Sequence, residues 1–314
     1  MILCVTLNPC VDKTLTVPAW HAGDNVRGTE VREVAGGKGN NVARALRRLG
    51  HAGRPVTFLG GPVGERCRAL LDADGDLDPI ILPSAASTRE ILTVRAPGVP
   101  ATAFFDPDPA ITRAEADALI ARVEAELATG HVRALTLSGS SPSPATHQTY
   151  SDLIALAGAR HVPTFLDTYG PSLAAIWGFW PEAISLNRRE AGGLLRSQTH
   201  PSDRQVFALL DQWSRRGVRL ATVTDGPHAV LARVDGRSYR AIPPRIEPLN
   251  PIGSGDSHLA GLVAARLADL DPEATLRRAV ACAVVNALTW DAGALDPAEV
   301  ERIEAQVTVE AANV

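Results

Sequence analysis

The sequence lacks the features that mark zinc-binding, membrane and nucleic-acid-binding proteins. Its four cysteines form no C-x-x-C pair and no cysteine–histidine cluster with zinc spacing, which argues against a structural zinc site. The apolar run over residues 279–290 is too short to cross a bilayer. The formal net charge of −4 argues against nucleic acid as the main partner. We therefore expect reduced cysteines, a cytoplasmic location, and neither a membrane nor a nucleic acid as partner.

Short motifs that identify several large enzyme classes are also missing. There is no G-x-x-x-x-G-K-[ST] loop, no pair of H-R-D and D-F-G motifs, no G-x-G-x-x-G after the first expected strand, and no G-x-S-x-G turn. These absences argue against P-loop enzymes, protein kinases, dinucleotide enzymes and α/β-hydrolases. Lysine is scarce too, because the 31 basic residues include only Lys13 and Lys38. Where arginine is the usual cation, a lysine indicates a position that needs a compact ammonium group.

Short apolar runs alternate with amphipathic segments along most of the chain. This alternation is typical of an α/β protein with a doubly wound, mostly parallel sheet flanked by helices. Strands are predicted at 2–7, 55–59, 134–137, 164–166, 183–186 and 219–223, and helices at 39–49, 113–128, 144–158, 188–196, 203–216, 255–269, 273–289 and 297–307. Two β-rich excursions, 12–34 and 88–105, predict a small β-sheet lid. We expect residues 1–314 to form a single large domain.

The segment Gly253-Ser254-Gly255-Asp256 leads directly into an apolar helix. Small residues allow backbone N–H groups to converge, and the first helical turn adds unpaired N–H groups and the positive end of the helix dipole. The segment therefore predicts an anion site suited to a phosphoryl group. A carboxylate would repel a bound phosphate unless it orients an attacking hydroxyl, so Asp256 is a candidate general base. The structural alternative is an aspartate that caps the helix after a glycine-rich turn.

Three further segments place polar groups where ligands bind in open α/β sheets. The glycine-rich stretch 36–39 precedes a helix and carries Lys38, and Asn41 follows with an amide suited to hydroxyl groups. Asp12 lies just beyond the first strand and is a candidate acceptor for sugar hydroxyls. Asn187 and Glu190 lie three residues apart at a strand-to-helix junction. The structural alternatives are a glycine turn with an asparagine cap in the first case and a capping box in the last.

Taken in order, these motifs resemble the ribokinase-like, or PfkB, family of carbohydrate kinases. The matching residues are Thr6-Leu7-Asn8-Pro9 with Asp12, Gly36-Gly37-Lys38-Gly39 with Asn41-Val42-Ala43-Arg44, Ser138-Gly139-Ser140, Leu166-Asp167-Thr168, Asn187 with Glu190, and Gly253-Ser254-Gly255-Asp256-Ser257. The resemblance extends over essentially the whole chain and is strongest to the branch of 1-phosphofructokinases and tagatose-6-phosphate kinases. It implies a ribokinase-like fold with a lid, and ATP and Mg²⁺ as cofactors.

The resemblance also implies a role for each matching residue. Asp256 matches the catalytic base, and Gly253, Ser254 and Gly255 match the anion site for the phosphoryl group. The residues that match the sugar pocket are Asp12, Gly36, Gly37, Lys38, Asn41 and Ser140, with Arg27 and Arg89 in one cleft as cations for a phosphate already on the substrate. Those that match the nucleotide site are Asn187, Thr224, Gly226, Gly253, Gly255 and Asn286. Asn187 and Glu190 also match the pair that organises Mg²⁺ through waters, and the lid implies a homodimer.

These roles predict ATP-dependent phosphorylation of a phosphorylated ketohexose of the fructose 1-phosphate or tagatose 6-phosphate type. Two departures from the branch leave alternatives open. Ser185-Leu186 stands where the branch usually has Lys-Pro, which removes a cation near the ATP phosphates. Glu90 follows Arg89 where the branch usually has isoleucine, which favours the alternative of an unphosphorylated sugar or nucleoside. A third interpretation, a non-catalytic sugar- or nucleotide-binding relative, is opposed by the retention of Asp256.

Overall fold

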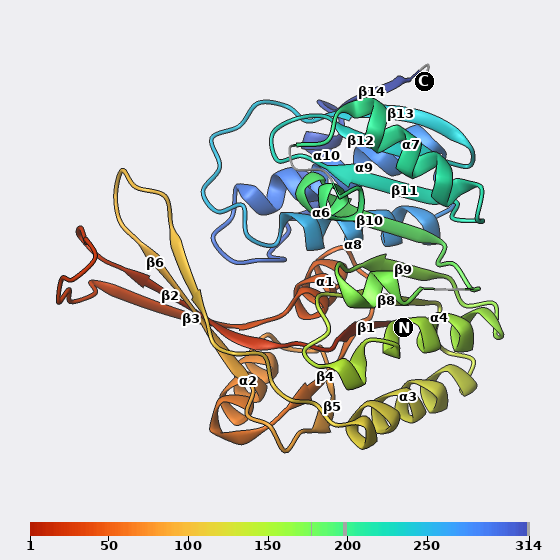
Figure 1. Ribbon diagram of the computed structural model, residues 1–314. Helices are drawn as coiled ribbons and strands as arrows, with labels where there is room; N and C mark the ends of the chain where they lie inside the picture. Colours follow the sequence, from red (N-terminus) through yellow and green to blue (C-terminus); the bar gives the residue numbers. More distant parts are fainter. Residues whose placement is uncertain (177, 197–199, 313–314) are drawn as a thin grey trace.

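The computed structural model describes residues 1–176, 178–196 and 200–312. Within these ranges the chain forms a ten-stranded sheet in the order β14-β13-β12-β11-β10-β9-β8-β1-β4-β5 (Figure 1). The parallel part comprises β5 (Ile80–Pro83), β4 (Gly53–Leu59), β1 (Ile2–Thr6), β8 (Ala134–Ser138), β9 (Thr164–Asp167), β10 (Ala183–Asn187) and β11 (Leu220–Thr224). Antiparallel strands β12 (Val230–Val234), β13 (Arg237–Ile242) and β14 (Thr308–Ala311) extend one edge.

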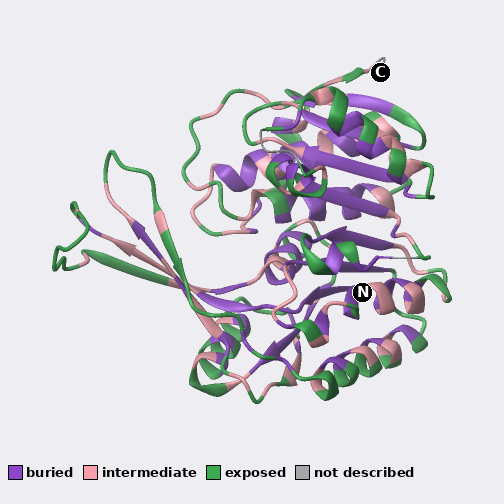
Figure 2. Ribbon diagram, viewed as in Figure 1, coloured by how far each residue is buried: buried purple, intermediate pink, exposed green. Residues whose placement is uncertain are grey.

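Helices cover both faces of this sheet. One apolar core includes side chains of α1 (Lys38–Arg48), α2 (Gly61–Ala73), α8 (Ser254–Leu267), α9 (Pro272–Ala287) and α10 (Pro297–Glu304). The other includes α3 (Arg113–Ala128), α4 (Thr149–Gly158), α5 (Pro171–Ala174), α6 (Arg188–Leu194) and α7 (Asp203–Ser214). Because both faces are covered, the parallel strands are largely buried and mostly apolar, and every residue of β1 is buried (Figure 2). No helix of the described ranges has both the length and the apolar character needed to cross a membrane.

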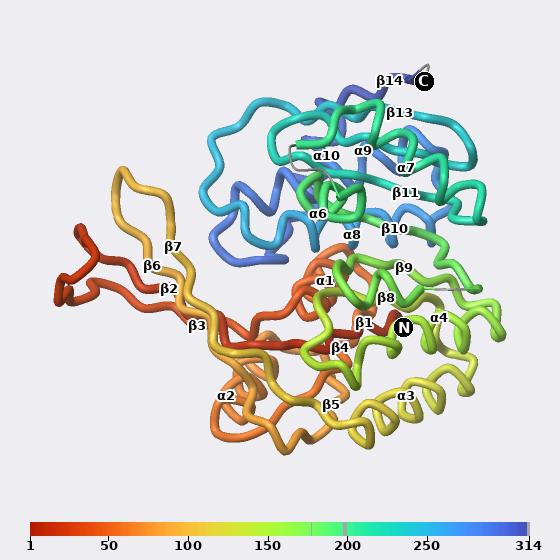
Figure 3. Tube along the Cα trace, in the orientation of Figure 1, coloured from red at the N-terminus to blue at the C-terminus, as the bar shows by residue number. Residues whose placement is uncertain are grey.

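A separate four-stranded sheet projects from the body in the order β3 (Glu30–Gly36), β2 (Cys10–Thr16), β6 (Arg89–Arg95) and β7 (Thr102–Phe105). Two segments far apart in the sequence lie side by side in it (Figure 3). Two arginines of this small sheet contact the body at the same aromatic ring: the guanidinium groups of Arg32 and Arg95 lie 4.9 and 4.4 Å from the centre of the Trp290 ring. Trp290 follows α9 in the sequence. It lies close in space to the turn that precedes α8, since Asn250 donates a hydrogen bond of 2.8 Å to its carbonyl oxygen.

The predicted fold class is confirmed, including the small sheet formed by the two β-rich excursions. Five details differ. Helix α2, strand β5 and the β12–β13 hairpin were not expected. The helix expected over 144–158 is a 3₁₀ turn (Pro144–Thr146) followed by α4, and the helix expected over 297–307 ends at Glu304, before β14.

The order of the parallel strands has a switch point at β1, and the region beyond the carboxyl ends of the strands at this point is the expected ligand crevice. From β1 the chain adds β4 and β5 on one side and later β8, β9 and β10 on the other. Ligands bind at such a switch point, beyond the carboxyl ends of the strands. Asn8 after β1 and Ser140 after β8 meet there, with Asn8 Nδ2 3.1 Å from Ser140 Oγ.

Candidate active site

The turn before α8 and the first turn of this helix leave backbone N–H donors unpaired. Gly253 has a φ of 83°, a left-handed conformation that disfavours a side chain, and a Cβ there would collide with Ala292. Within the described part of the chain, no protein acceptor meets the N–H groups of Gly255 and Asp256. The space beside Gly255 is open. These free donors and the positive end of the helix dipole fit a phosphoryl group.

Asp256 lies in the first turn of α8, and only 5% of the residue is exposed. Its Oδ2 accepts a hydrogen bond of 2.7 Å from Asn41 Nδ2, while Arg44 donates one of 2.7 Å to Asn41 Oδ1 and so fixes the orientation of the amide. Burial raises the pKa of Asp256 from 3.8 to about 7, although Lys38 and the bond from Asn41 oppose the rise. A general base works best with a pKa near the working pH. Asn41, expected in the sugar pocket, uses both ends of its amide to position this carboxylate.

Lys38 stands at the centre of a group of carboxylates. Its Nζ lies 2.8 Å from Asp167 Oδ1 and 3.4 Å from Glu190 Oε1. Burial opposes the charged form of Lys38, but Asp167, Glu190 and Asp256 together raise its pKa above the ordinary value. The lysine therefore stays an ammonium ion at neutral pH. A compact cation on a flexible stem can contact two carboxylates at once, which accounts for lysine here in an arginine-rich chain.

Asn187 and Glu190 form the capping box that was one interpretation of their spacing. Asn187 Oδ1 accepts from the Glu190 N–H, and Glu190 Oε2 accepts from the Asn187 N–H, both at 2.9 Å. The second oxygen of Glu190 faces Lys38, and burial raises the pKa of Glu190 although Lys38 opposes the rise. Capping thus uses only one carboxylate oxygen of Glu190, and the other lies 3.4 Å from Lys38 Nζ. Carboxylate and amide oxygens are the ligands that Mg²⁺ prefers, so this pair fits a magnesium site held through waters.

The assignment of Asn286 to the nucleotide site is wrong. Its side chain is fully buried, and all of its hydrogen-bonding positions are used within the protein. The amide donates to Ile252 O at 2.8 Å and Ser254 Oγ at 3.2 Å, and it accepts from Ser257 Oγ at 3.0 Å and Gly293 N at 2.8 Å. Asn286 therefore holds the anion-binding turn in shape from behind and has no group left for a nucleotide.

The expected sugar residues Asp12, Gly36 and Gly37 lie at the base of the small sheet. A Cβ at Gly36 would collide with the Asp12 carboxylate, and Gly37 has a φ of 113° immediately before α1. Burial raises the pKa of Asp12, although the guanidinium groups of Arg89 and Arg44 oppose the rise. Both glycines are thus required by close approach or by backbone conformation, and they let α1 begin directly beside Asp12.

Arg27 and Arg89 were expected in one cleft, but the structure places them far apart within this chain. Arg27 is exposed in the loop after β2, beyond the last paired residue, Thr16. Arg89 pairs with Cys10 at the opposite end of β2. A strand rises about 3.3 Å per residue, so roughly 20 Å separates the two positions. The register of β2 is the physical reason, and the sequence did not reveal it.

Arg89 instead pairs with a carboxylate of its own chain. Its Nη1 lies 2.9 Å from Asp108 Oδ1, and Asn8 Nδ2 donates to the same oxygen at 2.8 Å. The neighbouring Glu90 pairs with Val11, so it lies on the opposite face of the sheet from Asp12. The cation expected for the substrate phosphate is therefore at the crevice, but it already has an anionic partner.

Comparison with known proteins identifies the family. Residues 5–298 match the family described as pfkB family carbohydrate kinase. The chain belongs to the pfkB family of carbohydrate kinases. Phosphofructokinase-2 from Escherichia coli, in a tetrameric inhibited form, shares 22% identity over 97% of this chain and 98% of its own, with a TM-score of 0.85. A possible 1-phosphofructokinase from Thermotoga maritima shares 20% identity over 100% of both chains, with a TM-score of 0.85.

As a pfkB kinase, the protein is an enzyme that transfers phosphate to a sugar hydroxyl, and its fold is ribokinase-like.

Arg188 does not replace the lysine that the branch usually has before Asn187. This guanidinium is buried against Asp203 and Asp225, with Nη2 2.7 Å from Asp203 Oδ1 and Nε 3.2 Å from Asp225 Oδ2. Among the expected nucleotide residues, Thr224 ends β11 half-buried, and the exposed Gly226 turns with a φ of 54°.

Three charged residues of this pfkB kinase site were not predicted as site residues. Asp167 had a usable signal, because it directly follows the apolar strand at 164–166, as Asp12 follows the first strand. Arg44 was quoted within a motif, but its contact with Asn41 depends on the helical turn that brings the two together. Asp108 had no signal, because its position depends on how the segment after β7 packs.

Proposed function

We propose that the protein transfers the γ-phosphoryl group of ATP to a hydroxyl of a phosphorylated ketohexose, of the fructose 1-phosphate or tagatose 6-phosphate type, with Asp256 as the catalytic base. The observation that carries the proposal is the combination at the start of α8. A buried carboxylate with a pKa of about 7 lies in the same turn as the free N–H groups of Gly255 and Asp256. A site that only bound phosphate would gain nothing from that carboxylate.

The residues of the chain divide the work of phosphoryl transfer. Bound Mg²⁺–ATP supplies the phosphoryl group and the metal charge that neutralises it. Asp256 orients the sugar hydroxyl and accepts its proton, while the N–H groups at the start of α8 stabilise the negative charge on the group in transfer. The positive charge of Lys38 reduces the electrostatic repulsion between the surrounding carboxylates and a nearby triphosphate. Thr224, Gly226 and Asn187 are the candidates for the nucleotide side of the crevice.

A second candidate substrate is an unphosphorylated sugar or nucleoside. The specific observation in its favour is the pairing of Arg89 with Asp108 at 2.9 Å, because a neutralised cation attracts a phosphate less strongly. Arg27, the other expected cation, lies at the far end of the small sheet. The chemistry at Asp256 is the same for both candidates.

An ADP-release assay across fructose 1-phosphate, tagatose 6-phosphate, fructose 6-phosphate, free hexoses and nucleosides tests the proposal. We expect the highest kcat/KM with one of the ketohexose phosphates. Higher efficiency with a free hexose or a nucleoside than with every phosphosugar would contradict the proposed substrate class. Turnover of none of these compounds in the presence of Mg²⁺–ATP would contradict the proposed reaction.

The magnesium role of Glu190 predicts a measurable change in metal dependence. We expect Glu190→Gln to raise the Mg²⁺ concentration that gives half-maximal rate, because the charge that attracts the hydrated ion is lost. The fold should tolerate the change, since α7 has a capping box with glutamine, Gln205, at the same position. The matched control is Glu115→Gln in the capping box of α3. Equal Mg²⁺ dependence in both variants and the parent would contradict the metal role.

We also propose that the protein is a homodimer through the outer face of the small sheet, the face opposite Asp12. Val31 and Phe104 lie on that face with 53% and 52% of their surfaces exposed. Exposed apolar side chains on a sheet favour burial against a second copy. We expect Phe104→Asp to convert a dimer into a monomer in sedimentation experiments. A parent protein that sediments as a monomer at micromolar concentration would contradict this assembly.

A further inference from the structure

The anion beside Arg89 is the carboxylate of Asp108, a residue of the protein, where a substrate phosphate was expected. Its Oδ1 accepts two hydrogen bonds, from Arg89 Nη1 at 2.9 Å and from Asn8 Nδ2 at 2.8 Å. Asn8 Nδ2 also donates to Ser140 Oγ, so the amide bridges β1, β8 and the segment after β7. A guanidinium and an amide that donate to one oxygen form the arrangement in which proteins bind carboxylate or phosphate oxygens.

The two partners of this ion pair differ in exposure. The Arg89 side chain is 13% exposed and the Asp108 side chain 46%. Arg89 Nε is buried and has no acceptor within the described part of the chain. The cation is therefore fixed in the crevice with a donor to spare, whereas the carboxylate is at the solvent side and can rotate away. The pair is an anion-binding arrangement in which the chain supplies its own anion.

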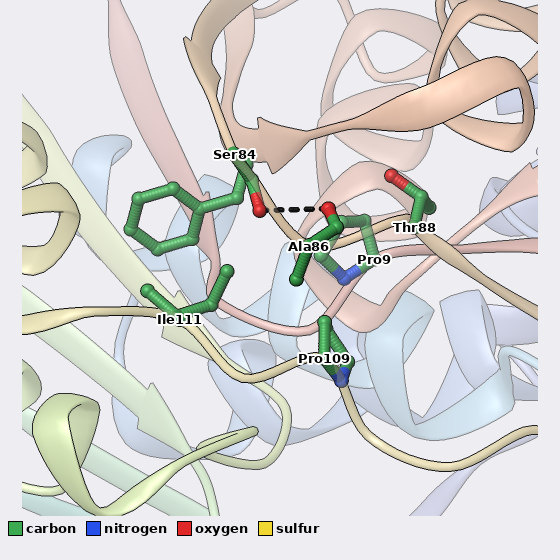
Figure 4. Close-up of a pocket in the computed structure, with 7 residues that line it drawn as sticks. Pro9, Ser84, Ala86, Thr88, Pro109 and Ile111 are labelled. Atoms are coloured by element: carbon green, nitrogen blue, oxygen red, sulfur yellow. Dashed lines mark hydrogen bonds between the residues drawn. The ribbon is translucent and has the colours of Figure 1, made fainter.

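The backbone holds this carboxylate in place. Asp108 stands between Pro107 and Pro109, which fix their own φ angles and keep Asp108 extended. Pro109 is buried in a small pocket with Pro9 and Ile111, where Ser84 Oγ donates a hydrogen bond to Ala86 O at 2.9 Å (Figure 4). An anchored proline directly after Asp108 leaves only side-chain rotation to move the carboxylate. The two prolines therefore hold the backbone of Asp108 so that its side chain can reach Arg89.

This geometry has opposite effects on charged and neutral substrates. A phosphate bound at Arg89 would lie within a few ångströms of the Asp108 carboxylate, and like charges at that distance repel strongly where water is partly excluded. A sugar hydroxyl at the same place could accept from Arg89 and donate to Asp108, so it would use both groups. The charge on Asp108 therefore lowers the affinity for a phosphosugar without a matching loss for a free sugar.

We propose that Asp108 is a specificity-determining residue that acts through Arg89 and weakens the preference for phosphorylated over free ketohexoses. The inference rests on the proposed function, because it assumes that Arg89 faces the end of the sugar that carries the phosphate. It concerns discrimination between substrates and not the chemistry at Asp256, so kcat and the KM for ATP are independent of it.

The test compares Asp108→Asn with the parent protein in steady-state assays. Asparagine keeps the size of the side chain and an oxygen that can accept from Arg89 and Asn8, but it removes the charge. The matched control is Asp106→Asn, two residues away, whose carboxylate accepts from the Glu90 N–H and does not contact Arg89. Tagatose 6-phosphate, fructose 1-phosphate and fructose 6-phosphate are the charged probes, and fructose is the neutral one. Asp108→Ser serves as a second variant if the asparagine variant is poorly folded by circular dichroism.

We expect Asp108→Asn to lower the KM for the best phosphosugar by about tenfold or more, with kcat and the KM for ATP within about twofold of the parent and no fall in the KM for fructose. A phosphosugar that only Asp108→Asn turns over would also support the inference, although the proposed substrate of the parent would then be wrong. An unchanged or higher KM for the phosphosugar, or an equal fall in Asp106→Asn, would overturn the inference and leave the proposed function standing. If neither protein turns over any phosphosugar, both are wrong.

Discussion

Replacing Asp256 with asparagine is expected to lower kcat by about 10²–10⁴-fold while the KM for ATP stays nearly unchanged. Asparagine can still accept the hydrogen bond from Asn41, so the turn before α8 keeps its shape. It cannot take the proton of the attacking hydroxyl. Steady-state assays with the best substrate measure both constants. A variant that keeps more than about a tenth of the parent turnover would show that Asp256 is not the base.

The raised pKa of Asp256 also predicts that the Asp256→Asn variant, although less active, is more stable than the parent at high pH. The group has a pKa of about 7 in the folded protein and 3.8 as an ordinary aspartate, so folding favours its protonated form. The resulting stability is fully present below about pH 4 and is lost as pH rises to about 7. Catalysis needs the ionised form, so the rate should rise over the upper part of this range. Activity and stability therefore depend on pH in opposite directions at this residue.

Asp256→Asn lacks the buried charge and should not lose this stability. We expect its thermal unfolding temperature to exceed that of the parent at pH 8 and to approach it below pH 4.5. Thermal unfolding of both proteins at the two pH values checks the direction of the stability difference. The kcat/KM of the parent across the same range checks that activity changes in the opposite direction. A variant that is less stable than the parent at pH 8 would mean that the ionised carboxylate stabilises the fold.

The parallel core of the fold could be predicted because its strands are buried on both faces. Such strands read as short apolar runs, and those at 2–7, 134–137 and 183–186 matched to within a residue. Helix α2 gave no comparable signal, because it begins with Gly-Pro and buries only Gly64, Cys67 and Leu71. The antiparallel edge was missed for a different reason. Strand β14 pairs with β13, about 70 positions earlier, and no local pattern encodes that pairing.

The candidate site divides in a similar way. Residues on one continuous turn, such as Gly253 and Asp256, could be predicted because glycine and a helix start are local features. Contacts between separate elements could not. The register of β2 separates Arg27 from Arg89, and the segment after β7 brings Asp108 to Arg89, although nothing near these residues in the sequence indicates either outcome.

Loss of the Lys38 charge is expected to have the second large effect. Lys38→Met would leave Asp167, Glu190 and Asp256 without their shared cation. An opposite charge a few ångströms away lowers a carboxyl pKa by about 1–3 units, so its removal should raise the pKa of Asp256 further. We expect the acidic limb of the kcat/KM profile to move up by about one pH unit or more.

Stability separates this explanation from a general effect of losing a lysine. Asp167 is nearly buried at 6% exposure, and leaving such a carboxylate unpaired costs up to about 3 kcal/mol in the free energy of unfolding. The other lysine, Lys13, pairs with Glu33 at 3.8 Å with its side chain 39% exposed, so Lys13→Met should cost less than about 1 kcal/mol. Urea unfolding at pH 7.5 compares the two variants. Equal losses, with no shift of the pH profile in Lys38→Met, would mean that Lys38 neither balances this group of carboxylates nor tunes Asp256. A pH shift in Lys38→Met alone would show that the ammonium acts on Asp256, in line with the way Lys38 opposes the rise in the pKa of that carboxyl group.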